Sequence, residues 1–170
     1  MHKPTLGRHE EGFTLIELLI VVAIITALAS MFLPKYLDAQ KRSDLAVAKA
    51  ELATLRTAIV LYRQDTGQYP NSTDDITTTA DWNNFLVTNP GVLGWKGAYT
   101  DRVSEDPWGN PYVFGNHFDE TDDGDPISHV MSYGVNGVLD TTDFTVDSPG
   151  GDDIVLYLEG QKGMGGGGEL

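Results

Sequence analysis

The chain has 170 residues, no cysteine and a formal net charge of −14. This length allows one small domain beside an anchor, and without cysteine the chain can form neither a disulfide nor a thiol nucleophile. Residues 34–65 carry six Lys and Arg against four Asp and Glu, whereas residues 66–170 carry three against eighteen. This acidity argues against nucleic-acid binding by the C-terminal part. It is equally compatible with a solvated surface and with attraction between the acidic part of one copy and the basic helix of another.

An apolar run at residues 13–33 dominates the N-terminal part of the sequence. Its 21 residues include one ionisable side chain, Glu17. At about 1.5 Å per residue, such a helix measures roughly 30 Å, enough to cross the apolar core of a bilayer. A carboxylate in a membrane is rare and costly, so Glu17 is either a functional residue or an acid tolerated near the interface. Residues 1–12 are polar like a leader, but no small-residue cleavage site fits cleanly after the run, so we expect the run to be retained.

The helical pattern continues past Pro34, where we expect a kink, to residue 65. Spacings of three and four residues predict an apolar seam made of Leu45, Ala48, Leu52, Leu55, Ile59 and Tyr62. A basic stripe recurs every seven residues beside this seam, at Lys35, Arg42, Lys49, Arg56 and Arg63. The seam predicts an amphipathic helix that packs on its own domain, and the stripe leaves contacts with neighbouring copies open. Gly67 followed by Pro70 predicts the end of the helix.

Residues 66–160 predict a small α+β head. Capping residues at 72–74 favour a short helix around 74–88, and strand-like segments follow at 111–114, 128–133 and 153–158. We expect these strands to form a small antiparallel sheet that packs on the amphipathic half of the long helix. The glycine-rich tail at 161–170 has no apolar pattern and is expected to be flexible. No catalytic set stands out, because acids are too abundant for a combination with His117 or His129 to be specific.

Two acidic loops offer the oxygen ligands that hard cations prefer. Residues 119–125 fail as an EF-hand loop because Thr121 takes the third position and Val130 the twelfth, so we interpret them as a solvated loop. The second region, residues 132–154, combines glycines with the side-chain oxygens of Asn136, Asp152 and Asp153. By composition alone, this second region is as compatible with a bare acidic loop as with a cation site.

The segment GFTLIE at residues 12–17 resembles the cleavage site and helix start of type IV pilins and pseudopilins. Further segments extend the resemblance to most of residues 12–158 and make the chain most similar to the major pseudopilin, the G subunit, of type II secretion systems. These segments are GQYP at 67–70, GWKGAY at 94–99, DPWGNPY at 106–112, SYGVNG at 132–137 and GDDI at 151–154.

The resemblance implies that a prepilin peptidase cuts after Gly12 and methylates the new N-terminus, Phe13. It also implies that Glu17 is the assembly acid and that Pro34 kinks the helix. The chain departs from the family before the cleavage site, where Glu10 and Glu11 stand in place of the more usual basic residues.

A structural calcium ion in the C-terminal loop is implied as well, in place of the disulfide that many type IV pilins use. The resemblance assigns side-chain ligands to Asn136, Asp152 and Asp153, with the carbonyl of Tyr133 as a further ligand. Asn136 stands where the family usually has Asp. Because the loop from 138 to 150 is longer than expected, Asp140 or Asp147 can substitute.

The implied division of the chain is a leader at 1–12, a transmembrane and filament-core helix at 13–33, an amphipathic helix half at 34–65, a head with a calcium loop at 66–160, and a tail at 161–170. The implied function is that of a structural subunit, not an enzyme, in a helical pseudopilus that drives protein export across the outer membrane. The implied location is the bacterial inner membrane with the head in the periplasm, and afterwards the periplasmic pseudopilus.

The implied partners are further copies of the chain, minor pseudopilins, the prepilin peptidase, an inner-membrane platform, an assembly ATPase and, before assembly, membrane lipid. In this reading the α-amine of Phe13 pairs with Glu17 of a neighbouring copy, and a misplaced subunit that leaves both charges unpaired costs about 3–5 kcal/mol. The alternatives are a type IV pilin for motility, adhesion or DNA uptake and a monomeric calcium-binding module tethered to the membrane. For a tethered hydrolase, the sequence offers no defensible residues.

Overall fold

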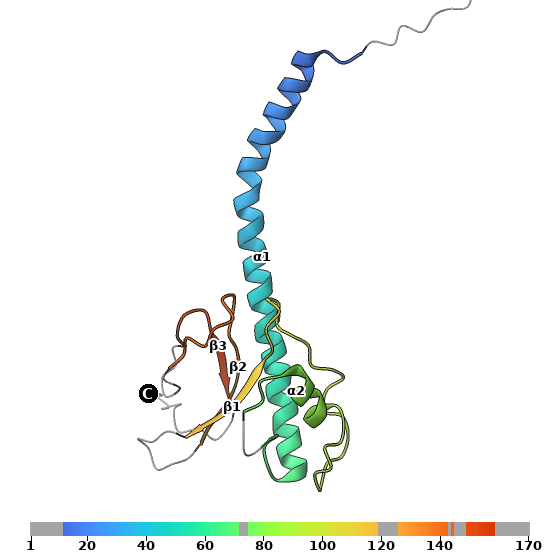
Figure 1. Cartoon of the computed structure of the whole chain (residues 1–170), viewed down its shortest axis with the longest axis vertical. Helices are drawn as coiled ribbons and strands as arrows, with labels where there is room; N and C mark the ends of the chain where they lie inside the picture. Colours follow the sequence, from blue (N-terminus) through green and yellow to red (C-terminus); the bar gives the residue numbers. More distant parts are fainter. Residues whose placement is uncertain (1–11, 72–74, 119–125, 143, 145–148, 159–170) are drawn as a thin grey trace, which may run out of the picture. The chain divides into compact units, whose positions relative to one another are not determined.

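The computed structural model describes residues 12–71, 75–118, 126–142, 144 and 149–158. The elements follow the order α1 (Leu15–Thr66), α2 (Thr79–Leu86), β1 (Val113–Phe118), β2 (Pro126–Ser132) and β3 (Ile154–Tyr157), as Figure 1 shows. Compact units cover residues 1–42 and 43–170. The proposed leader up to residue 11, the acidic loop at 119–125 and the tail at 161–170 lie outside the described residues.

Helix α1 runs for 52 residues and ends where the sequence predicts. Gly67 follows with φ +78°, and its N–H donates to the carbonyl of Arg63 at 2.8 Å, which closes the last turn. The predicted seam is buried from Ala48 onward, with Ala58 added: Ala48, Leu52, Leu55, Ala58, Ile59 and Tyr62. Leu45, which we expected in this seam, is 39% exposed. The seam is therefore one turn shorter than predicted, because the buried core of the head begins at Ala48.

Helix α2 is shorter than the predicted 74–88 for a local reason. Ile76 forms an antiparallel bridge with Phe114, and the two residues exchange both backbone hydrogen bonds at 2.9 Å. Residue 76 is therefore extended, and the helix begins only after Thr78. The Thr78 hydroxyl accepts from the N–H of Asp81 at 3.1 Å and caps the helix.

The three strands form one antiparallel sheet in the order β1-β2-β3. Its register pairs Phe114 with Val130 and Val130 with Leu156. The prediction of a small antiparallel sheet is confirmed, with β1 beginning at Val113, two residues after the predicted start at residue 111. The core unites this sheet with the seam of α1 and with Trp82 of α2, whose indole N–H donates to the carbonyl of Tyr112 at 2.8 Å. The fold is therefore a long helix on a small α+β head.

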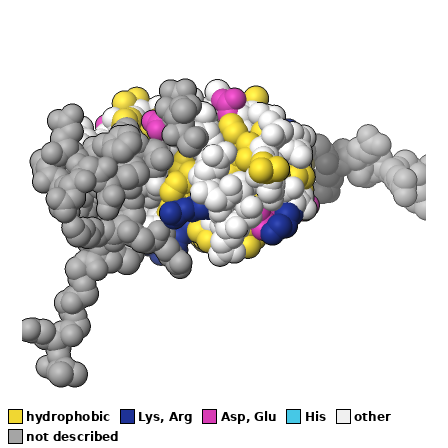
Figure 2. All heavy atoms as spheres, turned by 90° about the horizontal axis from the view of Figure 1, so that it is seen from below, with side chains coloured by type: hydrophobic (Ala, Val, Ile, Leu, Met, Phe, Trp, Pro, Cys, Tyr) yellow, Lys and Arg dark blue, Asp and Glu magenta, His cyan; other side chains and the backbone are white. Residues whose placement is uncertain are grey.

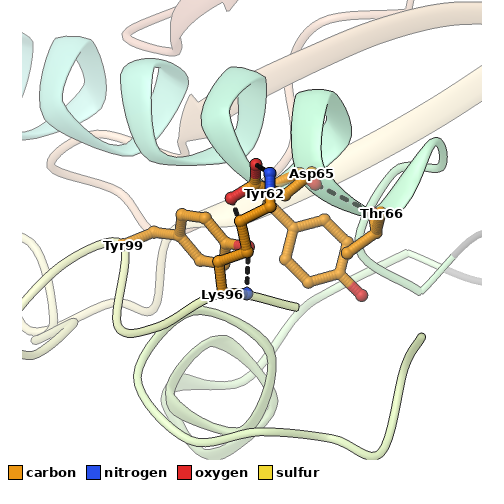
Figure 3. Close-up of polar contacts among 5 residues, drawn as sticks. All are labelled: Tyr62, Asp65, Thr66, Lys96 and Tyr99. Atoms are coloured by element: carbon orange, nitrogen blue, oxygen red, sulfur yellow. Dashed lines mark hydrogen bonds and ion pairs between the residues drawn. The ribbon is translucent and has the colours of Figure 1, made fainter. Parts of the chain in front are cut away.

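A polar clamp ties a loop of the head to the last turn of α1 (Figure 3). Lys96 Nζ lies 2.6 Å from Asp65 Oδ1, and the Tyr99 hydroxyl donates to Asp65 Oδ2 at 3.1 Å. The hydrogen bond from Lys96 lowers the pKa of Asp65. Gly94 lets the loop approach, because a Cβ there would lie 2.5 Å from the Asp65 carbonyl oxygen. On the face shown in Figure 2, basic, acidic and apolar side chains of the described residues are interspersed.

Two buried tyrosines provide a matched test of this core. The hydroxyl of Tyr62 is buried and has no hydrogen-bond partner among the described residues, whereas the Tyr112 hydroxyl donates to Glu51. Tyr62→Phe removes an unsatisfied polar group and should preserve or raise the melting temperature of the full chain in detergent. Tyr112→Phe should lower the free energy of unfolding by about 1–2 kcal/mol, because Glu51 loses its donor. A larger loss for Tyr62→Phe than for Tyr112→Phe would contradict this packing.

Candidate functional site

The first turn of α1 is closed by a reciprocal cap between Thr14 and Glu17. Glu17 Oε2 accepts from the backbone N–H and from the hydroxyl of Thr14, each at 2.8 Å. The N–H of Glu17 in turn donates to Thr14 Oγ1 at 3.3 Å. This is a capping box, in which each of the two residues satisfies a backbone donor that the helix itself leaves open. The sequence reasoning missed Thr14, although a threonine three residues before a glutamate is the signal that finds such a cap.

The helix that follows this cap leaves its apolar side chains exposed. Phe13 is 85% exposed, and the large apolar residues between Leu15 and Leu37 are exposed as well. Among the residues described, one helix, α1, is long and apolar enough to cross a membrane. Apolar surface of this extent marks a contact with lipid or with other protein chains.

Pro34 lies inside α1, and the helix continues on both sides of it. Without a backbone N–H, Pro34 cannot donate to the carbonyl of Ser30. The turns before it carry side-chain bonds to backbone carbonyls, from Thr26 to Val22 and from Ser30 to Ala27, both at 2.8 Å. The kink expected at Pro34 stays a prediction.

The second candidate region is the Asp153 loop, residues 133–142 and 149–153. Asp153 directly precedes β3, and the residue is buried, with an exposed fraction of 8%. Its Oδ2 accepts three hydrogen bonds, from the N–H of Asp140 at 2.9 Å and from the N–H and hydroxyl of Thr141 at 2.6 and 2.7 Å. Its Oδ1 is buried and has no hydrogen-bond partner within the described part of the chain. A buried carboxylate oxygen without a partner is costly, and such an oxygen is a suitable ligand for a hard cation.

Three other predicted ligand residues meet around the turn of the same loop. The N–H of Asn136 donates to Asp152 Oδ2 at 3.0 Å, and Asn136 Nδ2 donates to Asp140 Oδ2 at 2.7 Å. Gly134 and Gly151 make this approach possible, because a Cβ on either would overlap Asp152 or Asp140.

The Asp153 loop therefore brings several side-chain oxygen atoms close together, but their positions do not match those of a metal site. In the described part of the chain, no three His, Asp or Glu side chains are grouped closely enough to hold an ion. Tyr133 is half-buried, and burial, with the charges of Asp75 and Asp153, raises the pKa of its phenol. Asp147 lies outside the described residues. Hard oxygen donors and the unpaired Asp153 Oδ1 fit a calcium-like ion, whose ligands would have to draw together around it.

The sequence reasoning found Asn136, Asp140, Asp152 and Asp153, which the structure brings into one loop. It missed Thr141, whose hydroxyl and N–H both donate hydrogen bonds to Asp153 Oδ2. Because Thr141 is separated from Asp153 by 12 residues, no local pattern in the sequence connects the two.

The family model described as "Type II secretion system (T2SS), protein G" matches residues 35–153, and the prokaryotic N-terminal methylation motif matches residues 7–33. The type II secretion system core protein G of Aeromonas hydrophila is 29% identical over 143 residues, covering 80% of this chain and 90% of that protein. The protein of the same name from Vibrio cholerae is 34% identical over 111 residues, covering 63% of this chain and 71% of that protein.

One similar solved structure is the crystal structure of the major pseudopilin from the type 2 secretion system of enterohaemorrhagic Escherichia coli. It is 23% identical with a TM-score of 0.47, and the match covers 70% of this chain and 90% of that one.

Proposed function

This chain belongs to the type II secretion system protein G family, and we infer that it is a structural subunit of the pseudopilus filament of such a system, which drives protein export across the outer membrane. The observation that carries this inference is the protein G match over residues 35–153, which includes the packed seam of α1, helix α2 and the strands β1 and β2 of the head. A type IV pilin shares the N-terminal motif, but the match over the head favours the pseudopilin. Membership of a family of filament subunits also supports a structural role for this chain, without catalysis.

Processing at the N-terminus follows from the same family. We propose cleavage by a prepilin peptidase after Gly12 and methylation of Phe13, which the match of the methylation motif over residues 7–33 supports. Gly12 is exposed, and a side chain there would meet nothing within 4 Å. The backbone is therefore open to an enzyme at this bond. Cutting it leaves the α-amine of Phe13 one residue before the Thr14–Glu17 cap.

The exposed apolar part of α1 supports the proposal that the subunit occupies first a membrane and then a filament. Before assembly, the helix would lie in the inner membrane with the acidic head in the periplasm. In the filament, the same side chains would pack against copies of themselves, with the heads outside. Minor pseudopilins, an inner-membrane platform and an assembly ATPase complete this proposal as partners.

Glu17 would give the filament its register. One of its oxygens, Oε2, is used by the cap within the chain. The other, Oε1, accepts no hydrogen bond from the part of the chain that the structure describes. A neighbouring subunit's α-amine can therefore bind Oε1 while the cap stays intact. In an apolar environment the loss of either partner leaves an unpaired charge, at a cost of about 3–5 kcal/mol.

Substitution of Glu17 by Gln separates the charge from the cap. Gln can still close a capping box, because its side-chain oxygen accepts as Glu does. If pairing with an amine decides assembly, Glu17→Gln should abolish filaments as fully as Glu17→Ala. Thr14→Ala, which removes the cap hydroxyl but keeps the charge, should retain them. Filaments are counted by electron microscopy of cells that express the complete secretion system, with subunit levels matched. Normal filaments from Glu17→Gln would refute the charge-pair mechanism.

We further propose that the Asp153 loop binds a structural calcium ion. The residues that would hold it are Asp153 through Oδ1, Asp152, Asp140, Asn136 and the carbonyl of Tyr133. A bound ion would offset the charge of the carboxylates and join the turn at 133–140 to the start of β3. In a head with no cysteine, such a tie takes the place of a covalent one.

Calcium removal provides the test. A ligand at a hundred times its dissociation constant stabilises the folded state by about 2.7 kcal/mol, so chelation should lower the melting temperature of the full chain in detergent. Asp153→Ala should abolish this calcium dependence. Asp101→Ala, at an exposed acid outside the loop, is the matched control and should retain it. A melting temperature that chelator leaves unchanged in the unsubstituted chain would rule out the site.

A further inference from the structure

The exposed turn of the Asp153 loop contains the pair Asn136 and Gly137. We propose that Asn136 is a deamidation site in the folded head, whose product carboxylate stands beside Asp140 and Asp152. In this reaction the backbone nitrogen of the following residue attacks the side-chain amide carbon, so the geometry around the two residues decides whether it proceeds. The loop presents an available nucleophile, a polarised carbonyl and a carboxylate next to the leaving group.

The nucleophile is the backbone nitrogen of Gly137. Its N–H donates to no acceptor among the residues that the structure describes. With no side chain on Gly137, nothing on that residue blocks the approach to Cγ of Asn136. The fold itself keeps glycine here, because φ is +66° and a Cβ would lie 2.7 Å from Asn110 Oδ1.

The electrophile is held by two hydrogen bonds of different kinds. Asn136 Oδ1 accepts from the N–H of Val138 at 2.7 Å, and this donor stabilises the negative charge that develops on the oxygen during attack. Asn136 Nδ2 donates to Asp140 Oδ2 at 2.7 Å. That carboxylate therefore already contacts the nitrogen that departs.

The reaction balances without any redox partner. A bond forms between Gly137 N and Asn136 Cγ, and the bond between Cγ and Nδ2 breaks. The proton lost by Gly137 N ends on the departing nitrogen, which leaves as ammonia. Water then opens the resulting succinimide ring to give aspartate or isoaspartate at position 136.

The new charge changes the loop because the amide is a donor in the present arrangement. An aspartate at position 136 no longer donates to Asp140 and instead repels it. A cation between the carboxylates relieves this repulsion, so the product binds calcium more tightly than the amide does. This consequence rests on the proposed calcium function, whereas the deamidation itself does not.

The test follows the mass of the peptide that contains position 136. The full chain in detergent is incubated at neutral pH with chelator, and proteolytic peptides are compared by mass spectrometry with those of Asn136→Asp as the product standard. The native chain should convert at least as fast as the same chain unfolded in urea. Asp140→Asn should slow conversion in the native chain about fivefold, the effect of one hydrogen bond of ordinary strength. Asn136→Gln, which would have to close a larger ring, should show no conversion.

Two results would overturn the proposal: a native chain that stays unmodified while the unfolded chain converts, or an unchanged rate in Asp140→Asn. Calorimetric titration with calcium chloride tests the consequence separately. Asn136→Asp should bind calcium roughly tenfold more tightly than the unsubstituted chain, because affinity rises with the charge of the ligands. If neither protein binds calcium, the calcium function fails, while the mass measurement still decides the deamidation.

Discussion

The first half of α1 cannot bury its apolar side chains within its own chain, and the proposed role of the molecule depends on this constraint. Its large apolar residues from Leu15 to Leu37 are exposed and do not belong to the buried core of the head. Burial of such side chains contributes about 25 cal/mol per Å², so the segment must enter lipid or a bundle of like helices. This is the surface that the proposed function would use twice, as a membrane anchor before assembly and as the filament core afterwards.

The head is a small domain that must be stable without a disulfide, because the chain has no cysteine. Its core joins the seam of α1 from Ala48 to Tyr62 to a three-stranded sheet and one short helix. The polar clamp of Asp65, Lys96 and Tyr99 closes one loop, but its ion pair is largely solvated and contributes little. The buried Asp153 is more consequential, because its Oδ2 joins the Asp153 loop through three hydrogen bonds while its Oδ1 is buried without a partner among the described residues.

The sequence was most informative where structure depends on local periodicity. The end of α1 at Gly67, the seam from Ala48 to Tyr62 and the antiparallel sheet could all be predicted from spacing and turn residues. The start of α2 could not, because the bridge between Ile76 and Phe114 is a long-range contact that overrides local capping signals. Similarly, the four acidic and amide residues of the Asp153 loop could be named, but the hydroxyl that Thr141 supplies to Asp153 could not. The cap formed by Thr14 and Glu17 was within reach, since its spacing alone is diagnostic.

That cap also bears on how quickly a subunit can join a growing fibre. Had Glu17 been bound through both oxygens within its own chain, an incoming amine would have to displace an existing contact, and that rupture would set a barrier. Because Thr14 occupies Oε2 alone, docking through the proposed amine pair would add a contact without replacing one. In that arrangement an incoming subunit would not wait for a bond to break, and a departing one would leave behind a helix end that is still capped.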